Sequence, residues 1–181
     1  MEHIHITTPR LGLKSMTMPF LQACLKGSFE TAEEQSGLKL SQAWHDELWL
    51  ARLRYDQALE DEAMIAWLPL AIYERESDTM VGHLNFHTPP NPDYLQTIAA
   101  DAIEFGYHIF PDYRRRGYAL EAIQALIAWL KQQAGISTVV LSILPENTAS
   151  QRIAHKLGFK KWGEVFDEDE QNIEEIFTLS I

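Results

Sequence analysis

Apolar residues recur at helical spacing in four segments of the chain. The spacing predicts helices over residues 19–28, 41–62, 117–133 and 148–157. The longest of these segments has one apolar face, made of Trp44, Leu48, Ala51, Tyr55 and Ala58. Ser41 is a suitable N-cap for it, because its hydroxyl can accept a hydrogen bond from the first turn.

Runs rich in β-branched and aromatic residues alternate with these helices and predict strands. They cover residues 4–13, 66–73, 80–86, 102–110, 138–144, 159–166 and 173–181, and the first run is interrupted by Pro9. Polar turns between 66–73 and 80–86, and between the last two runs, predict antiparallel hairpins. The proline-rich stretch 87–100 predicts a loop with a helical turn.

The predicted elements follow the order β-α-α-β-β-β-α-β-α-β-β. Strands that alternate with helices in this way are typical of an α/β or α+β domain built on a mixed sheet. The chain has 181 residues, about the size of one domain. It contains no repeat, low-complexity tract or linker rich in Pro, Gly or Ser. We therefore expect a single domain over residues 1–181.

Charge and composition narrow the classes of function. Hydrophobic residues make up 46% of the chain, enough for one sizeable core, so a disordered chain is excluded. Fifteen basic residues against 26 acidic ones give a net charge of −11. Proteins that grip a polyphosphate backbone usually carry a basic excess, so nucleic acid is not an expected partner. The charge favours a cationic partner, such as an amine or a basic peptide.

Cys24 is the only cysteine, which excludes an intrachain disulfide and zinc sites built on several thiolates. No basic-then-apolar leader and no membrane-length apolar run is visible, so we expect a cytoplasmic protein without a membrane partner. His83 and His87 share one face of a predicted strand, and the same spacing recurs at His3 and His5. Without carboxylate or thiolate partners at ligand spacing, they are expected to face solvent, and no metal site is predicted.

The most informative stretch runs from Glu104 to Ala119, where a strand enters a tight loop that opens a helix. The loop holds Arg114, Arg115, Arg116 and Gly117. The first turn of a helix has unpaired N–H groups and a positive dipole end, and is therefore a ready anion site. A glycine there allows an anion to approach the backbone, and the arginines add charge where a diphosphate would lie. Judged alone, the loop is equally compatible with a solvated basic surface.

A second element follows the next strand, where Asn147 and Ser150 open a short helix that ends in Leu157, Gly158 and Phe159. The loop with Arg114, Gly117 and Ala119 resembles the acyl-CoA diphosphate loop of the GNAT acetyltransferase superfamily. The Asn147–Ser150 turn resembles the second CoA motif of that superfamily. Glu104 with Gly106 and Tyr107, and the Thr8–Leu11 segment, resemble the branch named for the ribosomal-protein acetyltransferases RimJ and RimL.

The resemblance implies a GNAT-like acyl-CoA N-acyltransferase fold, with a mixed, mostly antiparallel central sheet flanked by helices and splayed where CoA inserts. Acetyl-CoA would be the cosubstrate. Backbone amides of the loop would hold the diphosphate, and Ile109 and Asn147 would hold the pantetheine arm. The implied cofactor-binding set is Ile109, Arg114, Arg115, Arg116, Gly117, Tyr118, Ala119, Asn147 and Ser150. Asn147 also suits a helix N-cap, and the two roles are compatible.

Acetyl transfer to an amine needs a proton acceptor and a proton donor for the leaving thiolate. Glu104 is the candidate base, acting directly or through water, and its apolar strand predicts a raised pKa. Its alternative role is an ordinary strand carboxylate. Many GNAT enzymes place a tyrosine where this chain has Ala154. The RimJ/RimL-like branch instead offers Ser150 as the candidate acid, whose alternative role is a small helix residue.

The function implied is acetyl transfer from acetyl-CoA to a primary amine, by direct transfer in a ternary complex, since Cys24 lies far from the motifs. The branch suggests the α-amino group of a protein, of the ribosomal-protein type. Alternatives are a small amine, such as a polyamine or an aminoglycoside, and a non-catalytic CoA-binding sensor. Trp44 and Tyr55 are candidates to line the acceptor slot, although Trp44 and Trp49 also suit the core. A homodimer is compatible with the branch.

Overall fold

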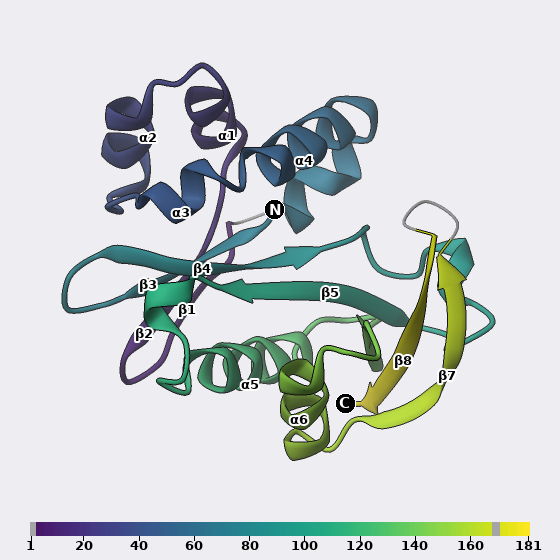
Figure 1. Ribbon diagram of the computed structural model, residues 1–181. Helices are drawn as coiled ribbons and strands as arrows, with labels where there is room; N and C mark the ends of the chain where they lie inside the picture. The colour runs from purple at the N-terminus through teal and green to yellow at the C-terminus, as the bar shows by residue number, and fades with distance from the viewer. Residues whose placement is uncertain (1–2, 168–170) are drawn as a thin grey trace. The chain divides into compact units, whose positions relative to one another are not determined.

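The computed structural model describes residues 3–167 and 171–181. Its contacts divide the chain into two compact units. The first comprises residues up to Phe86 together with Tyr107–Ala125, and the second comprises His87–Gly106 and Leu126–Ile181. Strand β5 (Ala102–Ile109) and helix α5 (Tyr118–Leu130) therefore each contribute to both units (Figure 1).

Antiparallel strands form the sheet of the first unit. They are β1 (His5–Thr7), β2 (Leu11–Ser15), β3 (Leu70–Glu74) and β4 (Thr79–Phe86), paired in that order. The β3–β4 hairpin agrees with the prediction. The single strand predicted over 4–13 is wrong: the chain turns between Thr7 and Leu11, and β1 and β2 form a hairpin. Pro9 in that turn has no N–H to donate to a strand ladder, which accounts for the break.

The helices of the first unit precede β3. They are α1 (Met18–Leu25), α2 (Phe29–Ser36), α3 (Gln42–His45), α4 (Leu48–Glu60) and the 3-10 turn η1 (Glu62–Trp67). Helix α1 confirms the prediction for 19–28, whereas α2 was not predicted. The single helix predicted over 41–62 is wrong, because it breaks at Asp46 and Glu47. Trp44 is buried on α3, and Leu50, Ala51, Arg54 and Ala58 are buried on α4.

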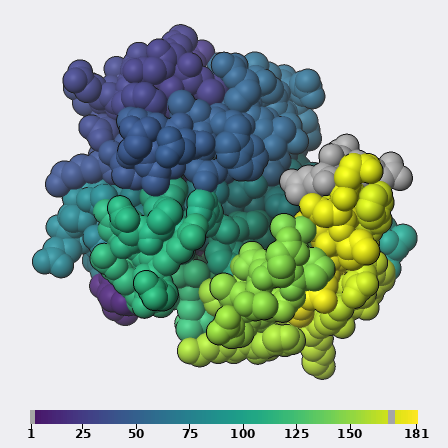
Figure 2. Space-filling model, in the orientation of Figure 1, coloured from purple at the N-terminus to yellow at the C-terminus, as the bar shows by residue number. Residues whose placement is uncertain are grey.

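One apolar core unites these helices with the sheet of the first unit. Helices α1 to α4 lie over one face of the strands, as Figure 1 shows. Their apolar side chains join Ala71 of β3 and Met80 of β4 around the fully buried Trp44. In Figure 2 the same helices form a continuous purple-to-blue surface. Trp49, by contrast, is 62% exposed, so its expected place in the core is wrong.

The second unit contains the C-terminal part of the sheet. Strands β5 and β6 (Thr138–Ile143) pair in parallel over Ala102–Glu104 and Thr138–Val140. Strand β6 pairs with β8 (Asn172–Ser180), which pairs with β7 (Lys160–Asp167), both antiparallel. The predicted mixed, mostly antiparallel sheet is confirmed. So are the C-terminal hairpin, helix α6 (Thr148–Lys156) and a helical turn, η2 (Asp93–Leu95).

The two faces of this C-terminal part of the sheet carry different side chains. Residues paired directly across a ladder point to the same face. Leu141 therefore shares a face with Phe177, against whose ring His155 of α6 packs edge-on. Val140, Ser142 and Ile176 lie on the opposite face, where Leu95 of η2 joins Val140 and Ile176 in a small core. Among the described residues, no helix combines the length and apolar character needed to cross a membrane.

Candidate active site

Glu104 lies on β5 in the second unit and is only 4% exposed. Both of its carboxylate oxygens accept hydrogen bonds. The Ser142 hydroxyl of β6 donates to Oε1 over 2.5 Å, and the Tyr94 hydroxyl of η2 donates to Oε2 over 2.7 Å. The Nδ1 atom of His87 lies 3.4 Å from Oε2. Glu104 is thus a buried carboxylate whose two oxygens both accept hydrogen bonds.

This environment corrects the predicted pKa of Glu104. Burial does raise the pKa, as the apolar strand suggested. The hydrogen bond and charge of His87, together with the donors Ser142 and Tyr94, outweigh burial, and the net pKa lies below its usual value. Glu104 is therefore an ionised carboxylate at neutral pH. It is a weaker base than the sequence suggested, but a well-oriented one.

The partners of Glu104 come from parts of the chain that the sequence analysis left without a function. Ser142 is a polar residue in the otherwise apolar strand β6, and that interruption was an available signal. Its position follows from the register, because Glu104 pairs with Val140 and Ser142 is the next residue on the same face. Tyr94 and His87 come from the proline-rich segment and the end of β4, where no sequence pattern pointed to a carboxylate.

Asn147 and Ser150 form one turn at the start of α6. The Asn147 side chain accepts a hydrogen bond from the Ser150 N–H over 3.1 Å, which makes Asn147 the N-cap of the helix. The N-cap role that the sequence suggested for Asn147 is therefore confirmed. Among the described residues, the side-chain partners of Glu104 are Ser142, Tyr94 and His87, and Ser150 is not one of them.

The arginine-rich loop lies in the first unit, between the 3-10 turn η3 (Pro111–Tyr113) and the first residue of α5. Arg115 has φ +61° and Gly117 has φ +80°, both in the left-handed region. This backbone path turns the chain sharply before the helix begins. Residues 114–117 are all exposed, and they lead directly into the first turn of α5. The anion site at this helix start stays a prediction.

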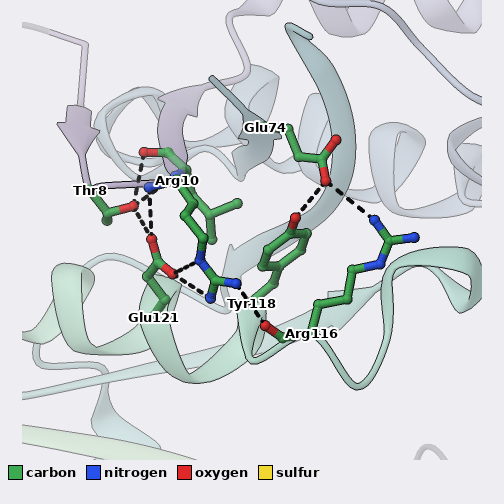
Figure 3. Close-up of polar contacts among 7 residues, drawn as sticks. Thr8, Arg10, Glu74, Arg116, Tyr118 and Glu121 are labelled. Atoms are coloured by element: carbon green, nitrogen blue, oxygen red, sulfur yellow. Dashed lines mark hydrogen bonds and ion pairs between the residues drawn. The ribbon is translucent and has the colours of Figure 1, made fainter. Parts of the chain in front are cut away.

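Residues more than 100 positions away in sequence hold this loop in place (Figure 3). Arg10, from the turn between β1 and β2, forms an ion pair with Glu121 of α5 over 2.6 Å and donates to the Arg116 carbonyl over 2.9 Å. Thr8 donates to the same Glu121 carboxylate over 2.5 Å. Burial raises the pKa of Glu121, but the hydrogen bonds from Thr8 and Arg10 lower it further, so the carboxylate is ionised.

Glu74 at the end of β3 holds the other side of the loop. It accepts a hydrogen bond from the Tyr118 hydroxyl over 2.5 Å, and Arg116 lies 3.5 Å from the same carboxylate oxygen. Figure 3 shows the side chains of Arg116 and Tyr118 both pointing toward Glu74. The hydrogen bond to Glu74 is the main reason that the pKa of Tyr118 is raised. Tyr118 is thus a neutral anchor of the loop.

Arg114 points back toward β5. Its Nε donates to the Ile109 carbonyl over 2.9 Å, and its Nη2 lies 2.7 Å from Nε2 of His108. The other ring nitrogen of His108 lies 2.8 Å from Oε1 of Glu47, at the start of α4. The guanidinium of Arg114, which the resemblance places beside a diphosphate, is therefore held by two protein acceptors. No sequence pattern indicated the partnership of His108 with Glu47.

His83 corrects the expectation for the paired histidines. It is 5% exposed, and burial, followed by the charge of neighbouring His108, lowers its pKa to about 3. Its ring lies among Trp44, His108 and Phe110. The prediction that it faces solvent fails because α3 and α4 cover this face of β4, which a strand pattern cannot reveal. His87, with a side chain 36% exposed, remains partly accessible.

Comparison with known proteins identifies the family. The model of the acetyltransferase (GNAT) domain matches residues 30–160, which is more than half of the chain. The chain is 24% identical to the uncharacterized N-acetyltransferase YjdG of Bacillus subtilis over 159 residues, or 85% of this chain and 88% of that protein.

Solved structures share the fold at low identity. The ribosomal-protein-S5-alanine acetyltransferase from Vibrio fischeri is 14% identical, with a TM-score of 0.66 over 98% of this chain and 96% of that one. RimL, a ribosomal L7/L12 α-N-protein acetyltransferase solved with coenzyme A, is 15% identical, with a TM-score of 0.67 over 98% of each chain. Both are consistent with the RimJ/RimL-like branch. The protein therefore belongs to the GNAT family and is an acetyl-CoA-dependent N-acetyltransferase.

Proposed function

We propose that the protein transfers the acetyl group of acetyl-CoA to the α-amino group of a protein N-terminus, of the ribosomal-protein type, in a ternary complex. The acceptor class rests on the solved ribosomal-protein acetyltransferases that share the fold. The net charge of −11 supports it, because it attracts a basic protein. Cys24 is fully buried and burial raises the pKa of its thiol, which argues against a covalent acetyl-cysteine step.

The proposed cofactor site uses the anion-binding start of α5. The N–H groups from Arg115 to Ala119 hold the diphosphate, and the arginines of the loop add charge. The exposed backbone, the left-handed turn at Gly117 and the anchoring by Arg10 support this role. The backbone of Ile109 and the side chain of Asn147 bind the pantetheine arm in this proposal. Acetyl-CoA supplies the activated acyl group when it is bound.

The proposed chemistry assigns the two protons that the acceptor ammonium loses. One leaves toward solvent through Glu104, which acts through a water molecule because its own oxygens already accept hydrogen bonds. The other replaces the proton that Ser150 gives to the departing thiolate. The single observation that carries the proposal is the buried Glu104, hydrogen-bonded by Ser142 and Tyr94, on the strand that precedes the arginine-rich loop.

The test is thiol release measured with matched peptides. A peptide with a free N-terminus and no lysine should stimulate release. The same peptide with an acetylated N-terminus and one internal lysine should not. Spermidine and an aminoglycoside are tested at the same concentration, and stimulation by these alone would shift the acceptor to small amines. If acetyl-CoA at 100 times its Kd stabilises the protein by about 2.7 kcal/mol while no amine stimulates release, the chain is a CoA-binding sensor.

A further inference from the structure

Three side chains from three elements of the first unit converge outside the predicted site. Glu47 lies at the start of α4, His83 lies on β4 and His108 lies on β5. One potential ligand atom from each lies within 4.8 Å of the other two. The His108 Nδ1 is 2.8 Å from Oε1 of Glu47, and the His83 Nε2 is 3.9 Å from Oε2. We refer to Glu47, His83 and His108 as the histidine cluster.

The cluster contains a buried polar group without a partner. Neither ring nitrogen of His83 has a hydrogen-bond partner among residues 3–167 and 171–181, although the residue is only 5% exposed. Buried polar atoms are nearly always paired, because an unpaired one loses its hydrogen bonds to water without a replacement. The neighbouring rings of Trp44 and Phe110 offer no oxygen or nitrogen acceptor to replace that bond. One of these two nitrogens, Nε2, lies 3.9 Å from Oε2 of Glu47, too far for a hydrogen bond, which indicates a missing ligand between them.

The donor set defines the chemistry of that ligand. Two imidazoles and one carboxylate are the ligands that zinc and neighbouring divalent transition metals take in open protein sites, where a fourth position is left to water. A metal ion here would give the His83 nitrogen a partner and would be neutralised in part by Glu47. We propose that the histidine cluster binds a divalent transition-metal ion, with Zn²⁺ as the reference ion. The proposal does not depend on the acetyltransferase reaction.

The carboxylate is already oriented for such a role. The Trp49 indole N–H donates to Oε2 of Glu47 over 3.0 Å, which leaves Oε1 directed at His108. Outer hydrogen bonds of this kind fix the direction of a metal-binding carboxylate. Trp49 is otherwise exposed, so this contact gives its indole N–H a defined function. The ion would be bound through Oε1 alone.

Metal binding requires the ring proton of His108 to move from one nitrogen to the other. The Nε2 of His108 accepts from Arg114, so its proton sits on Nδ1, where it is donated to Glu47. A metal ion at Nδ1 requires the lone pair there, so the proton moves to Nε2 and none is released. A protonated Nε2 cannot accept from Arg114, and that contact breaks. The metal ion and the Arg114–His108 hydrogen bond therefore exclude each other, which gives the proposal a specific signature.

The experiment titrates the tag-free full chain with Co²⁺ and follows its visible d–d absorption. We expect one Co²⁺ per chain, a band typical of nitrogen and oxygen ligands, and its loss when Zn²⁺ is added. Zn²⁺ affinity is then measured by competition with a chromophoric chelator. Binding that does not saturate at one ion per chain, or a spectrum identical to that of aqueous Co²⁺, would overturn the proposal.

Variants separate the cluster from incidental histidine binding. His83→Phe preserves an aromatic ring without ligand atoms and should weaken Zn²⁺ at least 10-fold. His155→Ala, at an exposed histidine of α6, is the matched control and should leave the affinity unchanged. If His83→Phe does not fold, Glu47→Gln serves as the second variant with the same expected loss. Equal affinities of the wild type and the cluster variants would overturn the proposal.

Arg114→Met tests the competition directly. It removes the hydrogen bond and the positive charge that oppose the ion at His108, so Zn²⁺ should bind several-fold more tightly. Arg115→Met is its control, because Arg115 adds a similar exposed charge in the same loop without the contact to His108. An equal gain in both variants would show a general charge effect and would remove His108 from the metal site.

Discussion

The surroundings of Glu104 and those of the arginine-rich loop differ in burial and in the type of side chain that contacts them. Glu104 is buried, and two of its three partners are the neutral hydroxyls of Ser142 and Tyr94. The loop is exposed and is held by ion pairs, above all Arg10 with Glu121. Exposed ion pairs contribute little stability but fix a backbone path, whereas donors around a buried carboxylate set its pKa. The first arrangement suits chemistry, and the second suits binding of a charged cofactor.

The largest effect on the reaction is expected for Glu104→Gln. We expect kcat to fall at least about 100-fold, because the proton acceptor is lost, while the Kd of CoA changes little. Tyr94→Phe is the matched control, since it alters the same carboxylate without removing it, and its kcat should fall far less. A kcat for Glu104→Gln within a few-fold of the wild type would remove Glu104 from the proton path.

Gly117→Val should affect binding instead. Gly117 has φ +80°, which a β-branched residue rarely adopts, and its side chain would stand at the proposed diphosphate site. We expect the Kd of CoA, measured by calorimetry, to rise about 10- to 100-fold.

Gly135→Val is the matched control, because Gly135 has φ +79° and open space around it. It should cost similar stability without changing the Kd of CoA. If both variants weaken CoA equally, backbone strain and not the diphosphate site explains the loss.

The pH–rate profile tests whether ionised Glu104 accepts the proton. The ionised form accepts the proton, so activity falls as pH drops through the pKa of Glu104, which lies below its usual value. In Ser142→Ala one donor to the carboxylate is lost, its pKa rises, and the acidic limb should move to higher pH by about one unit or less. An unmoved limb would mean that another group titrates there.

The smallest effect is expected for Arg10→Ala. The loop would lose its bond to the Arg116 carbonyl and its ion pair with Glu121, so the Kd of CoA should rise about three- to tenfold. The kcat at saturating acetyl-CoA should not change. Arg75→Ala is the control: the Arg75 side chain donates to the Thr8 carbonyl in the same segment, and among the described residues it forms no hydrogen bond or ion pair with α5. A drop in kcat alone would contradict a binding role for Arg10.

The amino-acid pattern alone predicted the strands and main helices from β3 to the C-terminus, together with the motifs at Glu104, Gly117 and Asn147. These features are local: a period of two or 3.6, a cap, a glycine at a left-handed turn. The same local signals failed where a neighbour decided the outcome. The spacing of Trp44, Ala51 and Ala58 fits one unbroken helix, yet the chain breaks at Asp46 and Glu47.

The charge states and partners of Glu104 and His83 follow from tertiary contacts. The predicted rise in the pKa of Glu104 came from burial alone, and the donors that reverse it come from another strand and a loop. His83 is buried because helices cover its strand, and Glu47 reaches it across that contact. Electrostatic effects depend on distance in space and not on separation in sequence. A one-dimensional pattern could therefore locate these residues on strands and helices but could not assign their neighbours.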